Sequence, residues 1–151
     1  MAYSSLSVAN AFINLAREEG KSLSNMQLQK LVFFAHGYVL AYLGKELTFD
    51  TPKAWTFGPV YPALYNSLRH FGSNGTDQCL PISDMEEVSQ QSDEFQIIWN
   101  VWQAYKFHSA AQLSRISHNI GSPWSQVWEI DQFGEIPNHI TREYYSGLIA
   151  K

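Results

Sequence analysis

The sequence has little of what cross-links secreted proteins or anchors membrane proteins. It contains a single cysteine, Cys79, so no disulfide can form within the chain, which is typical of a reducing compartment. Its apolar runs, such as residues 31–35, are far shorter than the roughly 20 residues of a membrane helix. The N-terminal residues MAYSSLSVAN lack the basic region and apolar run of a signal peptide. We therefore expect a cytoplasmic protein with no membrane segment.

Basic charge is also scarce. The chain has ten Lys and Arg residues against fourteen Asp and Glu residues, and its formal net charge is −4. Proteins that bind nucleic acids usually present a basic face that neutralises phosphates, and the scattered basic residues indicate no such face. A local patch of Lys21, Lys30 and Lys45 stays open, because these residues lie close in sequence. The composition therefore does not favour nucleic-acid binding.

Aromatic residues, in contrast, are abundant. The chain has nine Phe, five Trp and eight Tyr, and it is 45% apolar and only 16% charged. This composition is typical of a folded protein and differs from the charged, aromatic-poor composition of disordered chains. A chain of this length can bury about 70% of the surface that its unfolded form exposes. We expect one domain that spans residues 1–151.

Two N-terminal segments show the apolar spacing of helices. The first has an apolar stripe on a 3.6-residue period, an N-cap at Ser5 or Ser7 and a stop at Gly20. Its stripe consists of Val8, Ala11, Phe12, Leu15 and Ala16. In the second, Ser24 and Gln27 fit a capping box, and the following residues are apolar nearly all round. Such a helix belongs inside a helical domain, so we expect helix Ser24–Leu43 at its centre.

The rest of the chain predicts shorter helices and little β-structure. Three prolines exclude a regular helix before Pro62, where the third helix is expected to begin. Further helices are expected at residues 93–107, after Ser109 and from Asn138 or Thr141 to Ile149, with a short helical turn at residues 124–128. The inward residues are expected to be Leu64, Leu68 and Phe71 in the third helix, and Phe95, Ile98, Trp99, Trp102 and Tyr105 in the helix at 93–107. The predicted fold is mainly α: a compact domain of about six helices with at most a small β-hairpin near Phe49–Trp55.

The sequence shows no motif for catalysis, a cofactor or a metal. The five histidines lack the close helical spacing common in zinc sites, and Cys79 has no neighbouring group that would activate its thiol. His36 lies on the apolar central helix beside Gly37, which favours a buried, hydrogen-bonded imidazole. An alternative is an enzyme or ligand-binding site built from dispersed residues, for instance His36, His118 and Trp124. We expect no enzymatic activity.

The segment AWTFGPVYPALY, residues 54–65, combines prolines with large rings. Prolines fix the backbone, and rigid aromatic side chains are over-represented at binding hot spots. The expected partner-binding residues are Trp55, Phe57, Pro59, Tyr61 and Tyr65, together with Trp124 of the sequence GSPW. The alternative is that these rings only cover the helical core.

Three blocks of the chain resemble the Panacea antitoxin domain, also called SocA-like and often described as phage-associated protein. MQLQKLVFFAHGYVLA, residues 26–41, resembles its signature helix. AWTFGPVYPALYNSLRHFG, residues 54–72, resembles its Trp, aromatic-Gly-Pro-Val, Pro, Leu-Tyr pattern. SHNIGSPW, residues 117–124, resembles its Thr-His…Pro-Trp element, with Ser117 where Thr is usual. The structural residues within or beside these blocks are Gln27, Lys30, His36, Gly37, Gly58 and His118.

This resemblance implies an α-helical cytoplasmic antitoxin of a bacterial or prophage toxin–antitoxin pair, which neutralises a cognate toxin by direct protein–protein binding. In one branch of the family it implies a proteolytic adaptor that delivers the toxin to a Clp-type protease. A related alternative is a phage protein that targets a host factor. The family has no agreed catalytic residues, which agrees with the absence of a catalytic motif.

Overall fold

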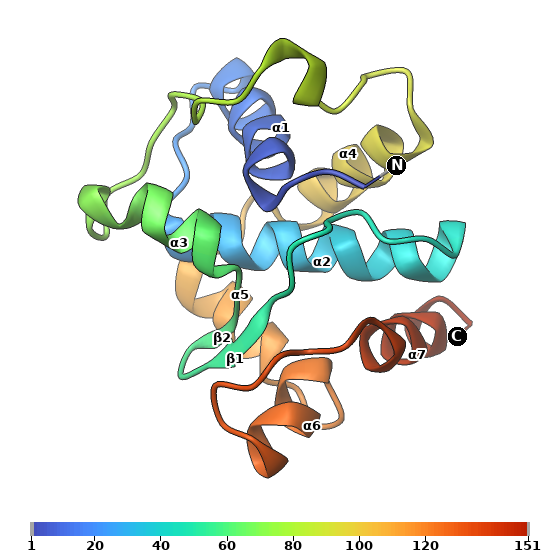
Figure 1. Ribbon diagram of the computed structural model, residues 1–151. Helices are drawn as coiled ribbons and strands as arrows, with labels where there is room; N and C mark the ends of the chain where they lie inside the picture. The colour runs from blue at the N-terminus through green and yellow to red at the C-terminus, as the bar shows by residue number, and fades with distance from the viewer. Residues whose placement is uncertain (1, 151) are drawn as a thin grey trace.

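The computed structural model describes residues 2–150 and is mainly α-helical, as the sequence predicts. Within that range it has seven α-helices, two short 3-10 helices and one two-stranded antiparallel sheet (Figure 1). In chain order they are α1 (Ser5–Glu18), α2 (Asn25–Leu43), β1 (Lys53–Trp55), β2 (Gly58–Val60), α3 (Pro62–Leu68), η1 (Arg69–Phe71), η2 (Asp84–Glu86), α4 (Asp93–Tyr105), α5 (Ala110–Ser117), α6 (Pro123–Ile130) and α7 (Asn138–Ile149).

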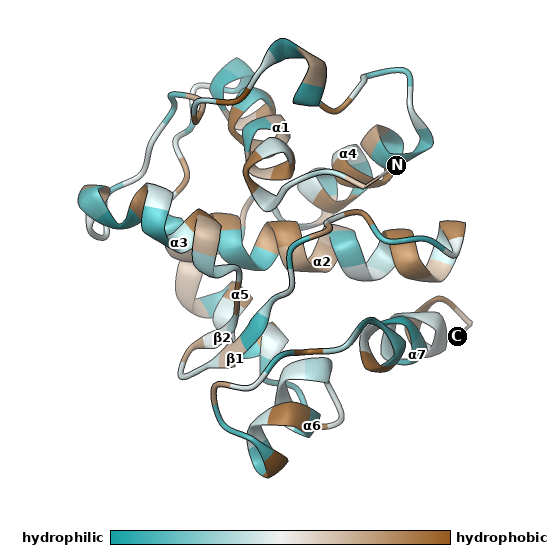
Figure 2. Ribbon diagram, viewed as in Figure 1, coloured by the Kyte–Doolittle hydropathy of each residue, from teal (hydrophilic) through white to brown (hydrophobic). Residues whose placement is uncertain are grey.

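Helix α2 forms the centre of the fold. Ser24 and Gln27 form the predicted capping box, and Gly44 ends the helix in the left-handed conformation, with φ of 69°. The helix packs against α1, α3, α4, α5, α7 and β2. It crosses the middle of Figure 1, with α1 and α4 on one side and α7 on the other. In Figure 2, hydrophobic positions recur from one end of α2 to the other, as expected for a helix covered on several sides.

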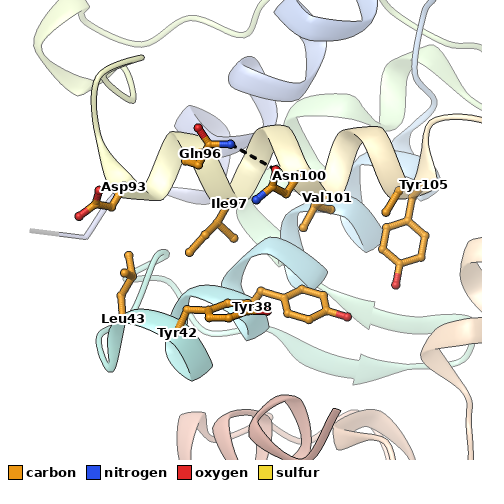
Figure 3. A pocket seen from close by; sticks show the side chains of 10 residues that line it. Tyr38, Tyr42, Leu43, Asp93, Gln96, Ile97, Asn100, Val101 and Tyr105 are labelled. Carbon is orange, nitrogen blue, oxygen red and sulfur yellow. Dashed lines mark hydrogen bonds between the residues drawn. The ribbon is translucent and has the colours of Figure 1, made fainter. Parts of the chain in front are cut away.

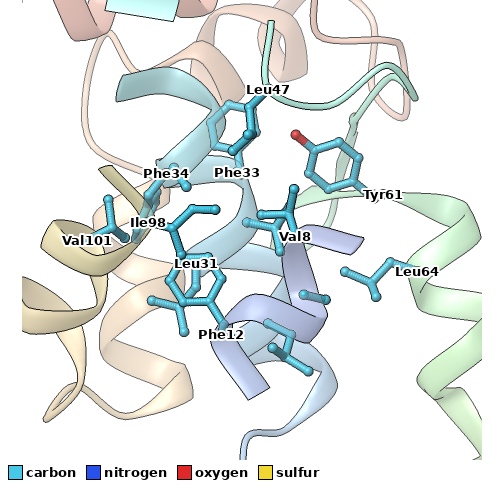
Figure 4. Packing of buried hydrophobic residues seen from close by; sticks show 14 of the residues in the cluster. Val8, Phe12, Leu31, Phe33, Phe34, Leu47, Tyr61, Leu64, Ile98 and Val101 are labelled. Atoms are coloured by element: carbon cyan, nitrogen blue, oxygen red, sulfur yellow. The ribbon is translucent and has the colours of Figure 1, made fainter. Parts of the chain in front are cut away.

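The hydrophobic core lies between α2 and the helices that surround it. Figure 4 shows side chains from α1, α2, α3 and α4 converging, including Val8, Phe12, Leu31, Phe34 and Ile98. The predicted α1 stripe is confirmed, since it contributes Val8, Phe12, Leu15 and Ala16 to the core. The predicted caps Ser5 and Ser7 are wrong: Ser4 accepts the capping hydrogen bond from the Ser7 backbone N–H, whereas the Ser5 hydroxyl donates to Asp50.

The β-hairpin lies farther along the chain than the sequence predicts. It pairs residues 53–55 with 58–60, so the expected location near Phe49–Trp55 is wrong for the second strand. Pro59 stands opposite Ala54, and it has no N–H to donate to that strand. Ala54 instead bonds on its other side: its N–H donates to the Gly134 carbonyl, and its carbonyl accepts from the Phe133 N–H. A distant segment thus completes the pairing of β1.

The other helices agree with the prediction apart from details at their surfaces. Helix α3 begins at Pro62, and Leu64 and Leu68 are buried, whereas Phe71 is only partly buried in the 3-10 turn that follows. On α4, Trp99 is 43% exposed instead of inward, and Val101 is buried. The short turn predicted at residues 124–128 is a helix of two turns, α6. None of the helices described within residues 2–150 is long and apolar enough to cross a membrane.

Candidate functional site: a groove over a buried lysine

A largely apolar groove of about 570 Å³ lies where α2, the hairpin, α3 and α5 come together. We call it the Lys30 groove. It is lined by Ser24, Asn25, Met26, Gln29, Lys30, Trp55, Thr56, Phe57, Val60, Tyr65, Gly72, Ser73, Ala110 and Phe133. The volume falls within the range of ligand-binding clefts in proteins, and such clefts usually combine apolar walls with a few polar groups.

Lys30 is the basic residue among those that line the groove. The side chain is 1% exposed, and its Nζ donates to the Pro59 carbonyl oxygen, 3.1 Å away. Among residues 2–150, no Asp or Glu oxygen lies within 4.0 Å of this nitrogen. A protonated amine can donate three hydrogen bonds, so Lys30 has capacity for further acceptors. Burial lowers the pKa of Lys30 to about 7, because the charged form has lost its hydration.

Gly58 lets the hairpin lie directly on this amine. Its φ is 116°, a conformation that side-chain-bearing residues rarely adopt. A Cβ atom at this position would lie 2.8 Å from Lys30 Cε and 2.5 Å from the Ser117 hydroxyl oxygen. The glycine therefore allows β2, α2 and α5 to meet.

Side chains of α5 and α6 hold the hairpin turn in place. The Ser114 hydroxyl donates to the Phe57 carbonyl at 2.8 Å, and Trp124 Nε1 donates to the Trp55 carbonyl at 2.6 Å. The ring of Trp55 also meets Tyr65 edge-on, with 5.1 Å between ring centroids. The aromatic rim of the groove is thus supported from behind.

His118 lies behind this turn, at the C-terminal end of α5. Its ring centroid is 4.0 Å from that of Trp124. Burial and the nearby charge of Lys30 lower the pKa of His118, while the backbone of Thr56 acts in the opposite direction. Its Nε2 is buried and has no hydrogen-bond partner within the described residues. A lowered pKa keeps the imidazole neutral at pH 7.

His36 occupies a different part of the core. Its Nδ1 accepts from the backbone N–H of Leu47 and of Thr48, at 3.3 and 3.2 Å. Nε2 must then carry the proton, which it donates to Asn138 Oδ1 at 2.9 Å. Burial lowers the pKa of His36, so the ring is neutral and links α2 to residues 47–48 and to α7.

The dispersed site considered from the sequence does not assemble. His118 contacts Trp124, but the hydrogen-bond partners of His36 are Asn138, Leu47 and Thr48, which belong to another part of the structure. Over residues 2–150, no three His, Cys, Asp or Glu side chains are grouped so that they could hold a metal ion.

Three of the six predicted partner-binding residues line the groove. These are Trp55, Phe57 and Tyr65, and Phe57 is 62% exposed. Trp124 is half-buried and supports Trp55 from behind.

Two other predicted partner-binding residues, Pro59 and Tyr61, are buried and do not line the groove. The Tyr61 backbone N–H donates to the buried Gln29 amide, which turns its ring into the core. The Tyr61 hydroxyl then lies 2.9 Å from Thr48 Oγ1.

The remaining signature residues, Gln27 and Gly37, make contacts that stabilise the fold. Gln27 completes the capping box of α2, and Gly37 faces the ring of Tyr145, where a Cβ atom would overlap that ring. A basic surface patch of Lys21, Lys30 and Lys45, left open from the sequence, does not form, because Lys30 is buried and cannot join the other two lysines at the surface.

Sequence reasoning missed Met26, Val60, Ala110 and Phe133 of the groove. Met26 and Val60 lie within the quoted blocks, but Phe133 comes from a distant segment that carries no local signal.

A second hollow of about 470 Å³ lies between α2 and α4 (Figure 3). Tyr38 and Tyr42 lie along one side, and Ile97 and Val101 lie along the other. Burial raises the pKa of Tyr105, so its hydroxyl stays neutral. Unlike the Lys30 groove, this hollow has no buried amine or carboxylate among its lining residues.

Comparisons with known proteins agree with the resemblance. The family model described as "Antitoxin SocA-like, Panacea domain" matches residues 28–125, a range that includes Lys30, the hairpin, His118 and Trp124. The chain is 32% identical over 130 residues to "Antitoxin SocA" of Caulobacter vibrioides (strain NA1000 / CB15N), covering 80% of this chain and 68% of that protein. No solved structure matches the chain with statistical significance. The chain belongs to the SocA-like Panacea antitoxin family.

Proposed function

We propose that this protein is a cytoplasmic antitoxin of a bacterial or prophage toxin–antitoxin pair, and that it neutralises its toxin by binding it directly at the Lys30 groove. It acts as a binding protein and not as an enzyme. The family membership supports the antitoxin function. The observation that carries the choice of surface is that the three sequence blocks converge there: Lys30 lines the groove, the Trp55–Phe57 turn forms its rim, and Trp124 holds that turn.

The rim has the physical properties of a binding hot spot. An exposed ring on a backbone that is already held pays little conformational entropy when a partner covers it. Phe57 fits this description, because its side chain is 62% exposed while its carbonyl accepts from Ser114. Truncating a hot-spot ring typically costs about 2–4 kcal/mol of binding free energy.

Co-expression with the product of the adjacent gene tests this function. If that product is a toxin, growth should stop when it is expressed alone and should resume when this protein is added. Phe57→Ala should weaken the rescue, and affinity measured by calorimetry should fall by about 30-fold or more. Phe49→Ala is the matched control, because Phe49 is also 62% exposed but lies outside the groove.

Two outcomes would contradict the proposal. An adjacent gene product that is harmless alone would remove the antitoxin function. Equal loss of rescue in Phe57→Ala and Phe49→Ala would place the contact surface elsewhere. The toxin's half-life, measured with and without a Clp-type protease, separates simple masking from delivery for degradation.

A further inference from the structure

The Lys30 groove combines mostly apolar lining residues with a buried amine. Its walls are mostly apolar, but Lys30 stands among its lining residues with only 1% of the side chain exposed. The amine has one hydrogen bond, to the Pro59 carbonyl, and no carboxylate within the described residues neutralises it. A buried amine with unused donors is costly for a protein unless a partner supplies the missing acceptors.

We propose that the groove binds an acidic side chain of the toxin, whose carboxylate accepts hydrogen bonds from Lys30 Nζ while a neighbouring apolar side chain packs against Met26 and the aromatic rim. This inference rests on the proposed function, and it names the chemistry by which the partner is recognised. The groove supplies apolar walls and an amine that can be protonated, and a toxin segment with an acidic side chain beside an apolar one would complement both.

Charge favours a carboxylate over a neutral acceptor. A carbonyl oxygen would accept a hydrogen bond from Lys30 Nζ, as the Pro59 carbonyl already does, but it would leave the positive charge of a protonated Lys30 uncompensated. A carboxylate offers two acceptor oxygens and the opposite charge, and hydrogen bonds between ionised partners are roughly twice as strong as neutral ones. The imidazole of His118 lies near this amine, and that ring is neutral at pH 7, so it does not compensate the charge of a protonated Lys30.

The structure also argues against a purely structural role for the Lys30 amine. A straight apolar side chain such as Met would fill a similar volume without a buried charge. The hairpin does not depend on the lysine alone, since Ser114 and Trp124 hold it by two separate hydrogen bonds.

Small probes test the inference without the toxin. The side-chain ¹³Cε signal of Lys30, assigned by its absence in Lys30→Met, should shift on titration with 3-phenylpropanoate, a carboxylate joined to an aromatic ring. The neutral 3-phenylpropanamide should produce little shift. The resonances of Met26 and Trp55, which line the groove, should shift with the carboxylate in the natural protein but not in Lys30→Met. Lys45→Met, the control that removes a half-exposed lysine, should respond as the natural protein does.

Binding of the toxin itself provides a second test of the inference. Lys30→Met should weaken its binding by about 30-fold or more, while Lys45→Met should leave it unchanged. Replacing each Asp and Glu of the toxin by Asn or Gln should reveal one position that matters for the natural protein and not for Lys30→Met. A short extension of the toxin's C-terminus should leave binding unchanged.

The outcomes separate the inference from the proposed function. If the toxin does not bind the natural protein, the proposed function fails, and the probes still test the groove. The inference is overturned if the amide binds as well as the carboxylate, if neither probe shifts Lys30, or if toxin binding is equal in Lys30→Met. Loss of binding on C-terminal extension, with no sensitive Asp or Glu, would assign the site to a terminal carboxylate and also overturn it.

Discussion

Replacing Lys30 by Met should stabilise the free protein, and the gain should depend on pH. In the folded state burial lowers the pKa of Lys30 from 10.5 to about 7. In the unfolded state the amine is hydrated and keeps its ordinary pKa. The folded protein therefore carries a cost of protonation that the unfolded chain does not, and methionine removes that cost.

The size of the effect follows from the two pKa values. Below pH 7 the amine is protonated in both states, and the cost reaches its full value of about 4–5 kcal/mol. As the pH rises from about 7 to about 10, the unfolded state holds more protons, so the natural protein gains about 1.4 kcal/mol of stability per pH unit. In Lys30→Met the Pro59 carbonyl loses its hydrogen-bond donor. This loss offsets about 1–3 kcal/mol of the stabilisation at every pH.

Urea unfolding followed by tryptophan fluorescence measures this difference. The free energies of unfolding of the natural protein and of Lys30→Met should differ most near pH 6 and converge toward about pH 9. The titration of groups that do not interact with Lys30 cancels in the comparison, because both proteins contain them, whereas His118, whose pKa the nearby charge of Lys30 lowers, adds a contribution at its own titration. Lys45→Met, which removes a 49% exposed amine that pairs with Glu94, is the control for the loss of a lysine that is not buried. A difference that is independent of pH would refute the conclusion that Lys30 is buried as a costly amine.

Two further substitutions test the core around α2. Gly37→Ala should destabilise the protein by about 1–3 kcal/mol, because the new methyl group would overlap a buried ring of α7, whereas Gly147→Ala, with no atom within 4 Å, should be neutral or slightly stabilising in thermal unfolding. Because burial lowers the pKa of His36, the unfolded state takes up a proton below about pH 6.5 that the folded state does not. The stability advantage of the natural protein over His36→Gln, measured by urea unfolding, should therefore shrink as the pH falls below that value; a constant advantage would show that His36 is not held neutral.

Local signals in the sequence were enough for most of the helices. The capping box of Ser24 and Gln27, the cap at Ser109 and the proline start at residue 62 each depend on atoms a few residues apart. The apolar stripe of α1 depends only on the helical period. These features do not require knowledge of the rest of the fold.

Features that depend on distant contacts were missed. The Ser5 hydroxyl donates to Asp50, and Ser4 caps the helix instead. Strand β1 pairs through Ala54 with residues 133–134 as well as with β2. Tyr61 belongs to an aromatic and proline-rich segment like Phe57, but its backbone bond to Gln29 places it in the core. Composition alone does not distinguish these two rings.

Lys30 illustrates the same limit at the candidate site. Its place in the signature helix could be recognised, but a lysine on a helix is ordinarily exposed, and the sequence does not show that β2 covers it. The convergence of the three sequence blocks on one groove becomes visible only in three dimensions.

The most direct measurement is the titration of the Lys30 ¹³Cε signal in the free protein and in its complex with the toxin. We expect the free amine to titrate near pH 7, and we expect it to stay protonated to distinctly higher pH in the complex, where a carboxylate compensates its charge. Identical titration curves in the two states would show that no acidic group of the partner reaches Lys30. A free amine that titrates at its ordinary value of 10.5 would show that it is not buried at all.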